Sequence, residues 1–258
     1  MKVVSLEDGY EQDFWNHVNQ DPLDYYFFIL DIKQRQEKTE IYLALEGRKV
    51  EGLMLIYAKH IVQLRGTRQA MKALFNRVGL EKVELQAPLD CEDIVLRKYK
   101  LWLRYEIILM RLRKGEENIQ IKHTPMKLGA DDVEEVVDLL RKADPEVWGD
   151  LDPEQQKANW KDTVLVGTKH KDRLVSVGLT RFVDFASNIG AIATDERYRN
   201  MGFATSVVSS LVQEILKNSA IALIHVRKDN APALRVYSKV GFEPYKHYLM
   251  VRGRAISI

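Results

Sequence analysis

A glycine-containing loop in the last quarter of the chain has the residue types of a phosphate-binding site. It ends in the segment Arg199-Asn200-Met201-Gly202-Phe203-Ala204 and follows an apolar stretch, Ser187–Thr194, that predicts a strand. Apolar residues at helical spacing after Gly202 predict that a helix begins there. The first N–H groups of a helix have no helical acceptor and lie at the positive end of its dipole, so they attract an anion. A pyrophosphate suits this loop, because Gly202 permits close approach and Arg199 supplies positive charge.

A second motif, further along the chain, predicts a helix with a potential proton donor. Its sequence is Asn230-Ala231-Pro232-Ala233-Leu234-Arg235-Val236-Tyr237-Ser238-Lys239-Val240-Gly241-Phe242. Asn230 followed by Pro232 is typical of a helix start, and Gly241 is typical of a helix end. Ala233 and Tyr237 are four residues apart and therefore share one face of this helix. The phenol of Tyr237 carries a proton that it can donate to a reacting group.

The two motifs stand in the order strand, loop, helix, strand, Asn-headed helix and Gly-Phe, with the second strand at residues 221–226. In this order they resemble the acetyl-CoA site of the GNAT (Gcn5-related N-acetyltransferase) superfamily. The resemblance implies an α/β (α+β) fold, with a mixed, mostly antiparallel twisted sheet flanked by helices, and acetyl-CoA as co-substrate. The cofactor-binding residues that it implies are Ile192, Ala193, Thr194, Arg199, Asn200, Met201, Gly202, Phe203, Ala204, Asn230 and Tyr237.

The resemblance also implies a mechanism. GNAT enzymes bind acetyl-CoA in an opening between two parallel strands, which here would be Ser187–Thr194 and residues 221–226. Backbone groups of residues 192–194 would pair with the pantetheine arm like an added strand, and a free N–H would hold the oxyanion. Asn230 would contact the CoA arm, and Tyr237 would protonate the leaving thiolate.

The base that takes the proton of the amine has more than one candidate. His225 titrates near neutral pH and lies at the end of a strand that lines the opening. A water relay from Asn188 or Thr194 is an equal alternative, and His225 is also compatible with a solvent-facing strand position.

The acceptor amine is expected to meet an acidic segment between the first two helices of the second half, residues 144–152. Glu146, Trp148 and Asp150 in this segment could attract and stack an amine or a basic peptide end. The same composition fits a solvated acidic turn equally well.

The first half of the chain repeats the strand pattern of the second. Strands predicted at residues 41–45, 50–57, 82–86 and 105–112 match those at 163–167, 174–182, 220–225 and 247–252. Residues 63–70 lack the Arg-x-x-Gly-x-Gly/Ala pattern, and no Asn-x-x-Ala-x-x-x-Tyr follows them. The sequence therefore predicts two tandem GNAT-like domains: a degenerate one at residues 1–115 without a CoA motif, and one at residues 116–258 with the acetyl-CoA site.

The expected boundary is a polar, glycine-containing stretch at residues 113–118. Residues 119–124 then predict a strand, and residues 130–142 predict an amphipathic helix. In the helix after Gly202, Ser206 and Ser209 fall mostly off the apolar stripe. The aromatic run at residues 25–30 predicts a core segment.

Composition excludes several classes of protein. The 258 residues carry a net charge of only +2 and no long basic block, which argues against nucleic-acid binding. A lone cysteine, Cys91, and six histidines without ligand spacing predict no disulfide framework and no metal site. We find neither a signal peptide at Met1 nor an apolar run of membrane-spanning length, so we expect a cytoplasmic protein without a membrane partner.

These observations predict an acetyl-CoA-dependent N-acetyltransferase that moves an acetyl group to a primary amine by direct attack in a ternary complex. The acceptor is left open among a small amine, an amino acid, an antibiotic and a protein or peptide amine. The alternative is a non-catalytic acyl-CoA-binding sensor. Because the first half of such tandems often covers the acceptor site or forms the subunit contact, a homodimer is possible.

Overall fold

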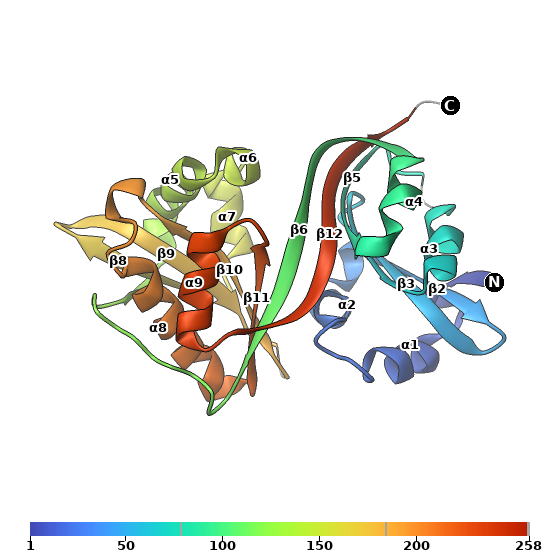
Figure 1. The fold of residues 1–258 in the computed structure, drawn as a ribbon, viewed down its shortest axis with the longest axis horizontal. Helices are drawn as coiled ribbons and strands as arrows, with labels where there is room; N and C mark the ends of the chain where they lie inside the picture. The colour runs from blue at the N-terminus through green and yellow to red at the C-terminus, as the bar shows by residue number, and fades with distance from the viewer. Residues whose placement is uncertain (78, 184, 257–258) are drawn as a thin grey trace. The chain divides into compact units, whose positions relative to one another are not determined.

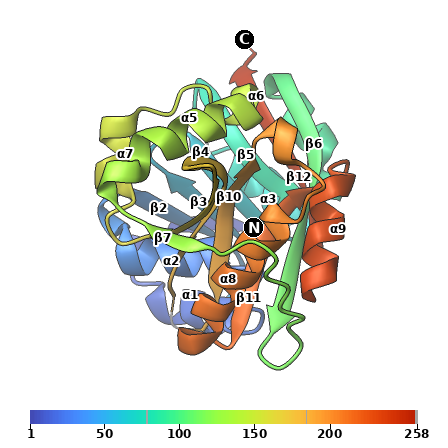
Figure 2. The ribbon, with the colours of Figure 1, turned by 90° about the vertical axis from the view of Figure 1, so that its left-hand side faces the viewer.

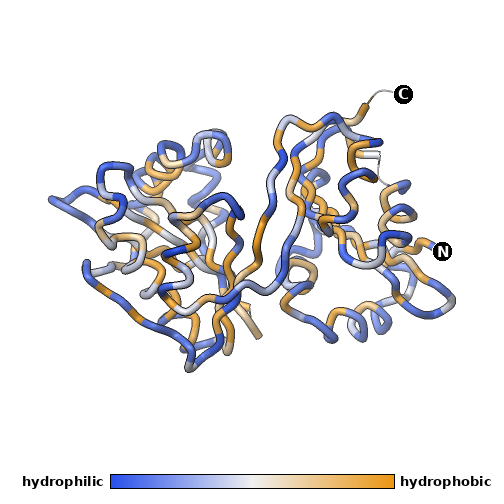
Figure 3. Tube along the Cα trace, viewed as in Figure 1, coloured by the Kyte–Doolittle hydropathy of each residue, from blue (hydrophilic) through white to orange (hydrophobic). Residues whose placement is uncertain are grey.

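The chain folds into two compact units. A computed structural model describes residues 1–77, 79–183 and 185–256. The first unit comprises Met1–Ile108 together with the C-terminal residues from Lys246 onward, and the second comprises Leu109–Tyr245. Figure 3 shows apolar stretches along the strands of each unit.

The first unit is a mixed sheet with helices (Figure 1). Its elements are β1 (Lys2–Ser5), α1 (Glu11–Val18), α2 (Tyr26–Gln34), β2 (Thr39–Glu46), β3 (Lys49–Tyr57), β4 (Ile61–Gly66), α3 (Arg68–Phe75), β5 (Lys82–Pro88), α4 (Glu92–Leu96) and the first part of β6 (Tyr99–Arg113). The strand order is β1-β2-β3-β4-β5-β12, antiparallel throughout except for the parallel pair β4 and β5.

The second unit has a similar succession of elements, with three described α-helices instead of two between its first two strands. Its elements are β7 (Met126–Leu128), α5 (Val133–Ala143), α6 (Pro145–Trp148), α7 (Pro153–Asn159), β8 (Val164–His170), β9 (Arg173–Arg181), β10 (Ser187–Thr194), α8 (Phe203–Asn218), β11 (Ile221–Arg227), α9 (Ala231–Val240) and β12 (Glu243–Ala255). The order is β6-β11-β10-β9-β8-β7, with β10 and β11 parallel. The predicted tandem α/β fold is confirmed, since the two halves share one order of strands and helices.

Helices cover both faces of the second sheet (Figure 2). Val177 of β9 packs in a cluster with Val136 and Val137 of α5. The next residue, Gly178, faces Val207 and Leu211 of α8. Because successive strand residues point to opposite faces, α5 and α8 lie on opposite sides of the sheet.

The last strand, β12, follows the second half in sequence but pairs with a strand of the first half. In β12, Tyr248 pairs with Pro88 and Arg254 pairs with Lys82, so its C-terminal part belongs to the first sheet, where it lies between β5 and β6. The N-terminal part of the first unit ends at Ile108, within β6, whereas the sequence predicts a boundary near residue 115. The C-terminal residues join the first unit because β12, and not β6, satisfies the free backbone groups along β5.

The strand predicted at residues 119–124 is wrong, because the next strand, β7, begins only at Met126. The backbone N–H of Gln120 donates to Ser209 Oγ at 3.0 Å, and those of Lys122 and His123 donate to Ser206 Oγ at 3.0 and 3.1 Å. These donors are used on α8 and are not available to a strand. We call residues 118–123 the strap. It explains why Ser206 and Ser209, although polar, are fully buried.

The aromatic run at residues 25–30 is core, as predicted. Tyr25, Tyr26, Phe28, Ile29 and Leu30 are all buried. The described helices include none that is long and apolar enough to cross a membrane.

In the first unit a buried arginine fills the place where the two parallel strands part. β4 pairs with β5 from Ile61 to Gln63, and Arg65 lies beyond this pairing with 3% of its surface exposed. Its Nε lies 2.5 Å from Asp24 Oδ1, and its guanidinium lies 4.0 Å from the ring centroid of Tyr248. Tyr248 donates to the same Asp24 oxygen at 2.5 Å. The guanidinium also donates to Gln86 Oε1.

A second arginine joins α3 to α4 in the first unit. The guanidinium of Arg68, the first residue of α3, lies 2.5 Å from Asp93 Oδ2 of α4 and also donates to the carbonyl of Asp90. The helix starts directly after β4, with Thr67 accepting a hydrogen bond from the N–H of Ala70 at 3.3 Å. No loop separates strand from helix here.

We predict that Arg65→Met lowers the free energy of unfolding by about 3–5 kcal/mol, because it leaves the Asp24 carboxylate buried without its main counter-charge. Burial alone would raise the pKa of Asp24, but Arg65, Tyr248 and Lys246 together hold it below its usual value. A depressed folded-state pKa contributes stability above the ordinary value of about 3.9, and this stability is lost as pH falls through the folded-state pKa. Urea unfolding at several pH values measures both effects.

The control is the double variant Arg65→Met with Asp24→Asn, which removes both charges and should recover most of the loss. A double variant no more stable than Arg65→Met alone would contradict the charge argument.

Candidate cofactor and active site

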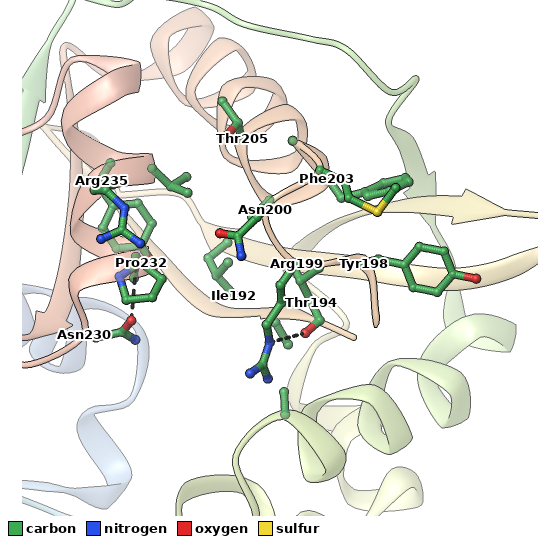
Figure 4. Close-up of a pocket in the computed structure, with 18 of the residues that line it drawn as sticks. Ile192, Thr194, Tyr198, Arg199, Asn200, Phe203, Thr205, Asn230, Pro232 and Arg235 are labelled. Atoms are coloured by element: carbon green, nitrogen blue, oxygen red, sulfur yellow. Dashed lines mark hydrogen bonds between the residues drawn. The ribbon is translucent and has the colours of Figure 1, made fainter. Parts of the chain in front are cut away.

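A cavity of about 710 Å³ lies in the second unit between β10, the start of α8 and α9 (Figure 4). Every residue that the sequence predicted to bind the cofactor lines it. The remaining lining residues are Lys122, Ala143, Asp144, Trp148, Tyr198, Thr205, Pro232, Ala233, Arg235, Val236 and Lys239. In Figure 4, Asn230, Pro232 and Arg235 lie on the α9 side, and Arg199 and Asn200 lie on the loop opposite.

The cavity begins where two parallel strands separate. β10 pairs with β11 from Ser187 to Ile189, where Ile189 lies opposite Ile224. Directly afterwards a bulge shifts the pairing of β10 with β9 between Gly190 and Ala193, and Ala191 has a φ of 48°. A bulge bends its strand and increases the local twist, so it turns residues 192–194 away from β11.

The bulge depends on a glycine in the neighbouring strand. A Cβ on Gly178 would overlap Ile192 Cδ1 and lie 2.8 Å from Leu211 Cδ1. The side chain of Ile192 therefore occupies the space that a side chain at position 178 would need. The absence of that side chain lets the bulge of β10 pack against α8.

The loop after β10 places backbone donors at the cavity. A short 3-10 turn, Glu196–Tyr198, is capped by Asp195, which accepts from the N–H of Arg197 at 3.0 Å. Asn200 and Gly202 both have left-handed backbones, with φ of 62° and 95°. Gly202 is the N-cap of α8 and offers no side-chain acceptor to the first helical N–H groups. These groups remain suited to an anionic ligand.

Two arginines of this loop have different surroundings. Arg197 is ion-paired with Asp195 at 2.8 Å, and this partner lowers the pKa of the Asp195 carboxyl to about 2. The charge of Arg197 is therefore compensated. Arg199 instead donates from Nε to the carbonyl of Thr194 at 3.3 Å, which leaves the rest of its guanidinium for a ligand.

Positive charge exceeds negative charge around the cavity. Its cations are Lys122, Arg199, Arg235 and Lys239, and within the ranges that the structure describes none of them forms an ion pair with a carboxylate. Asp144 is the carboxylate among the lining residues, and its Oδ1 accepts from the N–H of Val147 at 3.2 Å. Unpaired cations next to a helix N-terminus favour a multiply charged anion.

Tyr237 lies on α9 with 5% of its surface exposed. Its ring meets Phe242 edge-on, with 6.2 Å between ring centroids. Burial raises the pKa of this phenol above its ordinary value, so it stays protonated. Its hydroxyl neither donates to nor accepts from any described residue, which leaves its proton for a ligand in the cavity.

Asn230 has a structural role that the sequence also allowed. It caps α9, with Oδ1 accepting from the N–H of Ala233 at 3.2 Å. The NH₂ group of this side chain is a separate donor, so capping and ligand contact are compatible.

His225 lies outside the lining of the cavity. It is half-buried on β11, and its Nδ1 lies 3.0 Å from Asn188 Oδ1 of β10. Both residues of this pair therefore lie at the point where the strands separate. Thr194, the other candidate for a relay, does line the cavity and hydrogen-bonds to Ser176 Oγ at 2.8 Å.

The predicted acceptor residues separate in the structure. Trp148 lines the cavity, whereas Glu146 and Asp150 are exposed and do not. Glu146 lies 3.9 Å from Arg227. Among the described residues no cluster of His, Cys, Asp or Glu could hold a metal ion.

Sequence reasoning missed Lys122, Asp144, Tyr198, Arg235 and Lys239. Arg235 and Lys239 lie inside the second motif, one turn apart on α9, and this spacing was a usable signal. Lys122 reaches the cavity only because the strap folds against α8, which its own sequence did not indicate.

Comparison with known proteins agrees with this geometry. Residues 166–251 match the model of the FR47-like protein family. A comparison with curated proteins finds no match.

Several solved structures are similar. A protein from Drosophila has a TM-score of 0.73 at 11% identity, covering 96% of this chain and 98% of its own. A GNAT-family acetyltransferase from Colwellia psychrerythraea has a TM-score of 0.59 at 12% identity, covering 98% and 100%. A tandem GNAT protein from the clavulanic acid biosynthesis pathway has a TM-score of 0.59 at 11% identity, covering 100% and 99%. The resemblance to the GNAT superfamily and the tandem GNAT fold are confirmed.

We predict that Gly178→Val destabilises the second unit by about 1–3 kcal/mol, because the added side chain overpacks against Ile192 and Leu211. The displaced bulge should also weaken ligand binding in the cavity. Thermal unfolding and a binding titration measure the two effects.

Gly190→Ala is the matched control, since its Cβ would lie at an ordinary distance of 3.5 Å from Leu179 Cδ1. Equal losses of stability in the two variants would show that the packing of Ile192 over residue 178 is not the cause.

Proposed function

We propose that this protein is an acetyl-CoA-dependent N-acetyltransferase that acetylates a primary amine. The observation that supports this most directly is the composition of one cavity. It combines a helix N-terminus, unpaired cations and a buried phenol without a hydrogen-bond partner among the described residues. A nucleotide thioester carries anionic phosphates at one end, which suit the helix N-terminus and the cations. Its sulfur leaving group at the other end suits the phenol.

Each part of the cavity has a role in this proposal. The N–H groups at Gly202, Phe203 and Ala204 would hold the pyrophosphate, with Arg199 and Arg235 adding charge. Residues 192–194, which have left the parallel pairing with β11, would hydrogen-bond to the pantetheine arm as an added strand. When bound, acetyl-CoA supplies an activated acetyl group as a thioester.

The transfer needs three groups from the chain: a donor to the oxyanion, a donor to the sulfur, and a base for the amine. A backbone N–H near the bulge would stabilise the oxyanion formed when the amine nitrogen attacks the carbonyl carbon. Tyr237 would hydrogen-bond to the sulfur as the carbon–sulfur bond breaks. Because burial raises the pKa of Tyr237, while a thiol has an ordinary pKa of about 8.5, the phenol stabilises the thiolate as a donor rather than by complete proton transfer.

A base must also accept the proton of the amine. His225 is the candidate that we favour, because it lies where β10 and β11 separate and its Nδ1 lies 3.0 Å from Asn188 Oδ1, which fixes the orientation of the imidazole ring. A water held by Thr194 is the alternative, since Thr194 lines the cavity itself. On the acceptor side, Trp148 lines the cavity and would stack on the incoming amine, and Glu146 and Asp150 would attract it from solution.

A non-catalytic acyl-CoA sensor is the second candidate. It is favoured by the chemistry of the described lining residues, which include no histidine and only one carboxylate, Asp144, already engaged as a helix cap. Release of free thiol in the presence of acetyl-CoA and any amine excludes this reading.

We predict that calorimetric titration shows saturable binding of acetyl-CoA, and that Gly202→Asp abolishes it by adding a negative charge beside the phosphates. Gly202→Asn is the matched control, because Asn has nearly the same size, tolerates the left-handed conformation and carries no charge. It should retain most of the affinity. If the intact protein does not bind acetyl-CoA, the proposed function is wrong.

We predict that Tyr237→Phe lowers kcat by about 10²-fold, the usual effect of one proton donor, and leaves the Kd for acetyl-CoA nearly unchanged. An amine panel with thiol detection supplies kcat, and calorimetry supplies Kd. Tyr10→Phe, in the first unit, is the control for the loss of a phenol. Full turnover by Tyr237→Phe with intact binding would remove this residue from the mechanism.

A further inference from the structure

We propose that Lys122 of the strap forms an ion pair with a phosphate of the bound nucleotide, and that the strap is a third wall of the cofactor site beside the two sequence motifs. This inference rests on the proposed function. It assigns a specificity-determining contact to a segment that belongs to neither the loop after β10 nor the helix α9.

The strap is fixed on the second unit along its whole length. Its first residue, Asn118, donates from its N–H to the carbonyl of Val240 at 2.8 Å and from Nδ2 to that of Lys239 at 3.1 Å. Further on, the N–H of Gln120 donates to Ser209 and those of Lys122 and His123 donate to Ser206. The strap therefore spans from the end of α9 to the start of α8, the two helices that border the cavity.

His123 attaches the end of the strap to the phosphate loop itself. Its ring stacks on Phe203, with centroids 3.6 Å apart and planes inclined by 11°. Its Nε2 lies 2.9 Å from the carbonyl oxygen of Met201, which is an acceptor, so Nε2 carries the proton. The backbone beside Lys122 is thus held against the residues expected to bind the pyrophosphate.

Lys122 itself lies at the left-handed glycine of this loop. A Cβ on Gly202 would be 3.5 Å from Lys122 Cδ, an ordinary van der Waals distance, so the aliphatic stem runs along the face of Gly202. The side chain lines the cavity and forms no ion pair with any described carboxylate. A lysine with an anchored backbone and an unpaired ammonium group at a helix N-terminus is arranged to meet an anion.

The chemistry of that anion follows from the surrounding charges. Arg199 on the loop and Arg235 and Lys239 on α9 also border the cavity, so several cations converge on one volume. A ligand with only a diphosphate needs fewer cations to balance its charge than a ligand that also carries a phosphate monoester. The strap lysine is therefore a contact to either the diphosphate or the 3′-phosphate of coenzyme A, and the experiment separates the two.

The test is calorimetric titration of the full chain with CoA and with dephospho-CoA, which lacks the 3′-phosphate. Three variants are compared with the unaltered protein: Lys122→Met, Lys122→Arg and Lys127→Met. Lys127 lies on β7 nearby but is paired with Glu214 at 3.1 Å and does not line the cavity, so it controls for loss of a lysine. We expect Lys122→Met to bind CoA roughly tenfold more weakly, the effect of one charge-assisted hydrogen bond, and Lys122→Arg to retain the affinity.

The outcomes separate this inference from the proposed function. If the unaltered protein does not bind CoA, the proposed function and this inference fail together. If it binds CoA and Lys122→Met behaves like Lys127→Met, the strap contact is wrong while the CoA site on which the proposed function depends is supported. A loss seen with CoA but not with dephospho-CoA supports contact with the 3′-phosphate, and an equal loss with both supports contact with the diphosphate.

Discussion

The separation of two parallel strands is the constraint on which the rest of this structure depends. β10 and β11 share only three paired positions, Ser187 to Ile189, before the bulge turns β10 aside. Without that divergence the backbone groups of residues 192–194 would hydrogen-bond to β11, and these residues would not line the cavity beside α8 and α9. Three residues maintain this divergence: Gly178 by its lack of a side chain, Ala191 by its left-handed backbone, and Ile192 by a side chain that lies over Gly178.

In the first unit two parallel strands also separate, but side chains of the protein fill the space between them. β4 and β5 also pair over three positions, and the space beyond them is occupied by Arg65, Asp24 and Tyr248. Where α8 and α9 of the second unit border a cavity, α3 and α4 of the first are joined by Arg68 and Asp93. Charges that in one half remain available to a ligand are satisfied within the protein in the other.

Most of this architecture was predictable because strand and helix periodicity is a local property. The repeated strand order and the two motif helices followed from spacing along the chain, and the set of predicted cofactor residues, which line one cavity, followed from the resemblance to the GNAT superfamily. The errors arose from contacts between distant segments. The strand predicted at residues 119–124 does not form, because the backbone donors of the strap bind serines of α8. Likewise, no local pattern indicates that β12 pairs with β5.

That pairing of β12 with β5 has a consequence for how the protein is made. A domain usually folds as its residues leave the ribosome, the N-terminal domain first. Here the strand between β5 and β6 is missing until residues 248–254 have been synthesised. One edge of β5 therefore stays unpaired while nearly all of the second half is translated. An exposed strand edge can pair with other chains. The first unit is thus the part of this protein with the greatest need of chaperone protection during translation, although most of its residues are synthesised first.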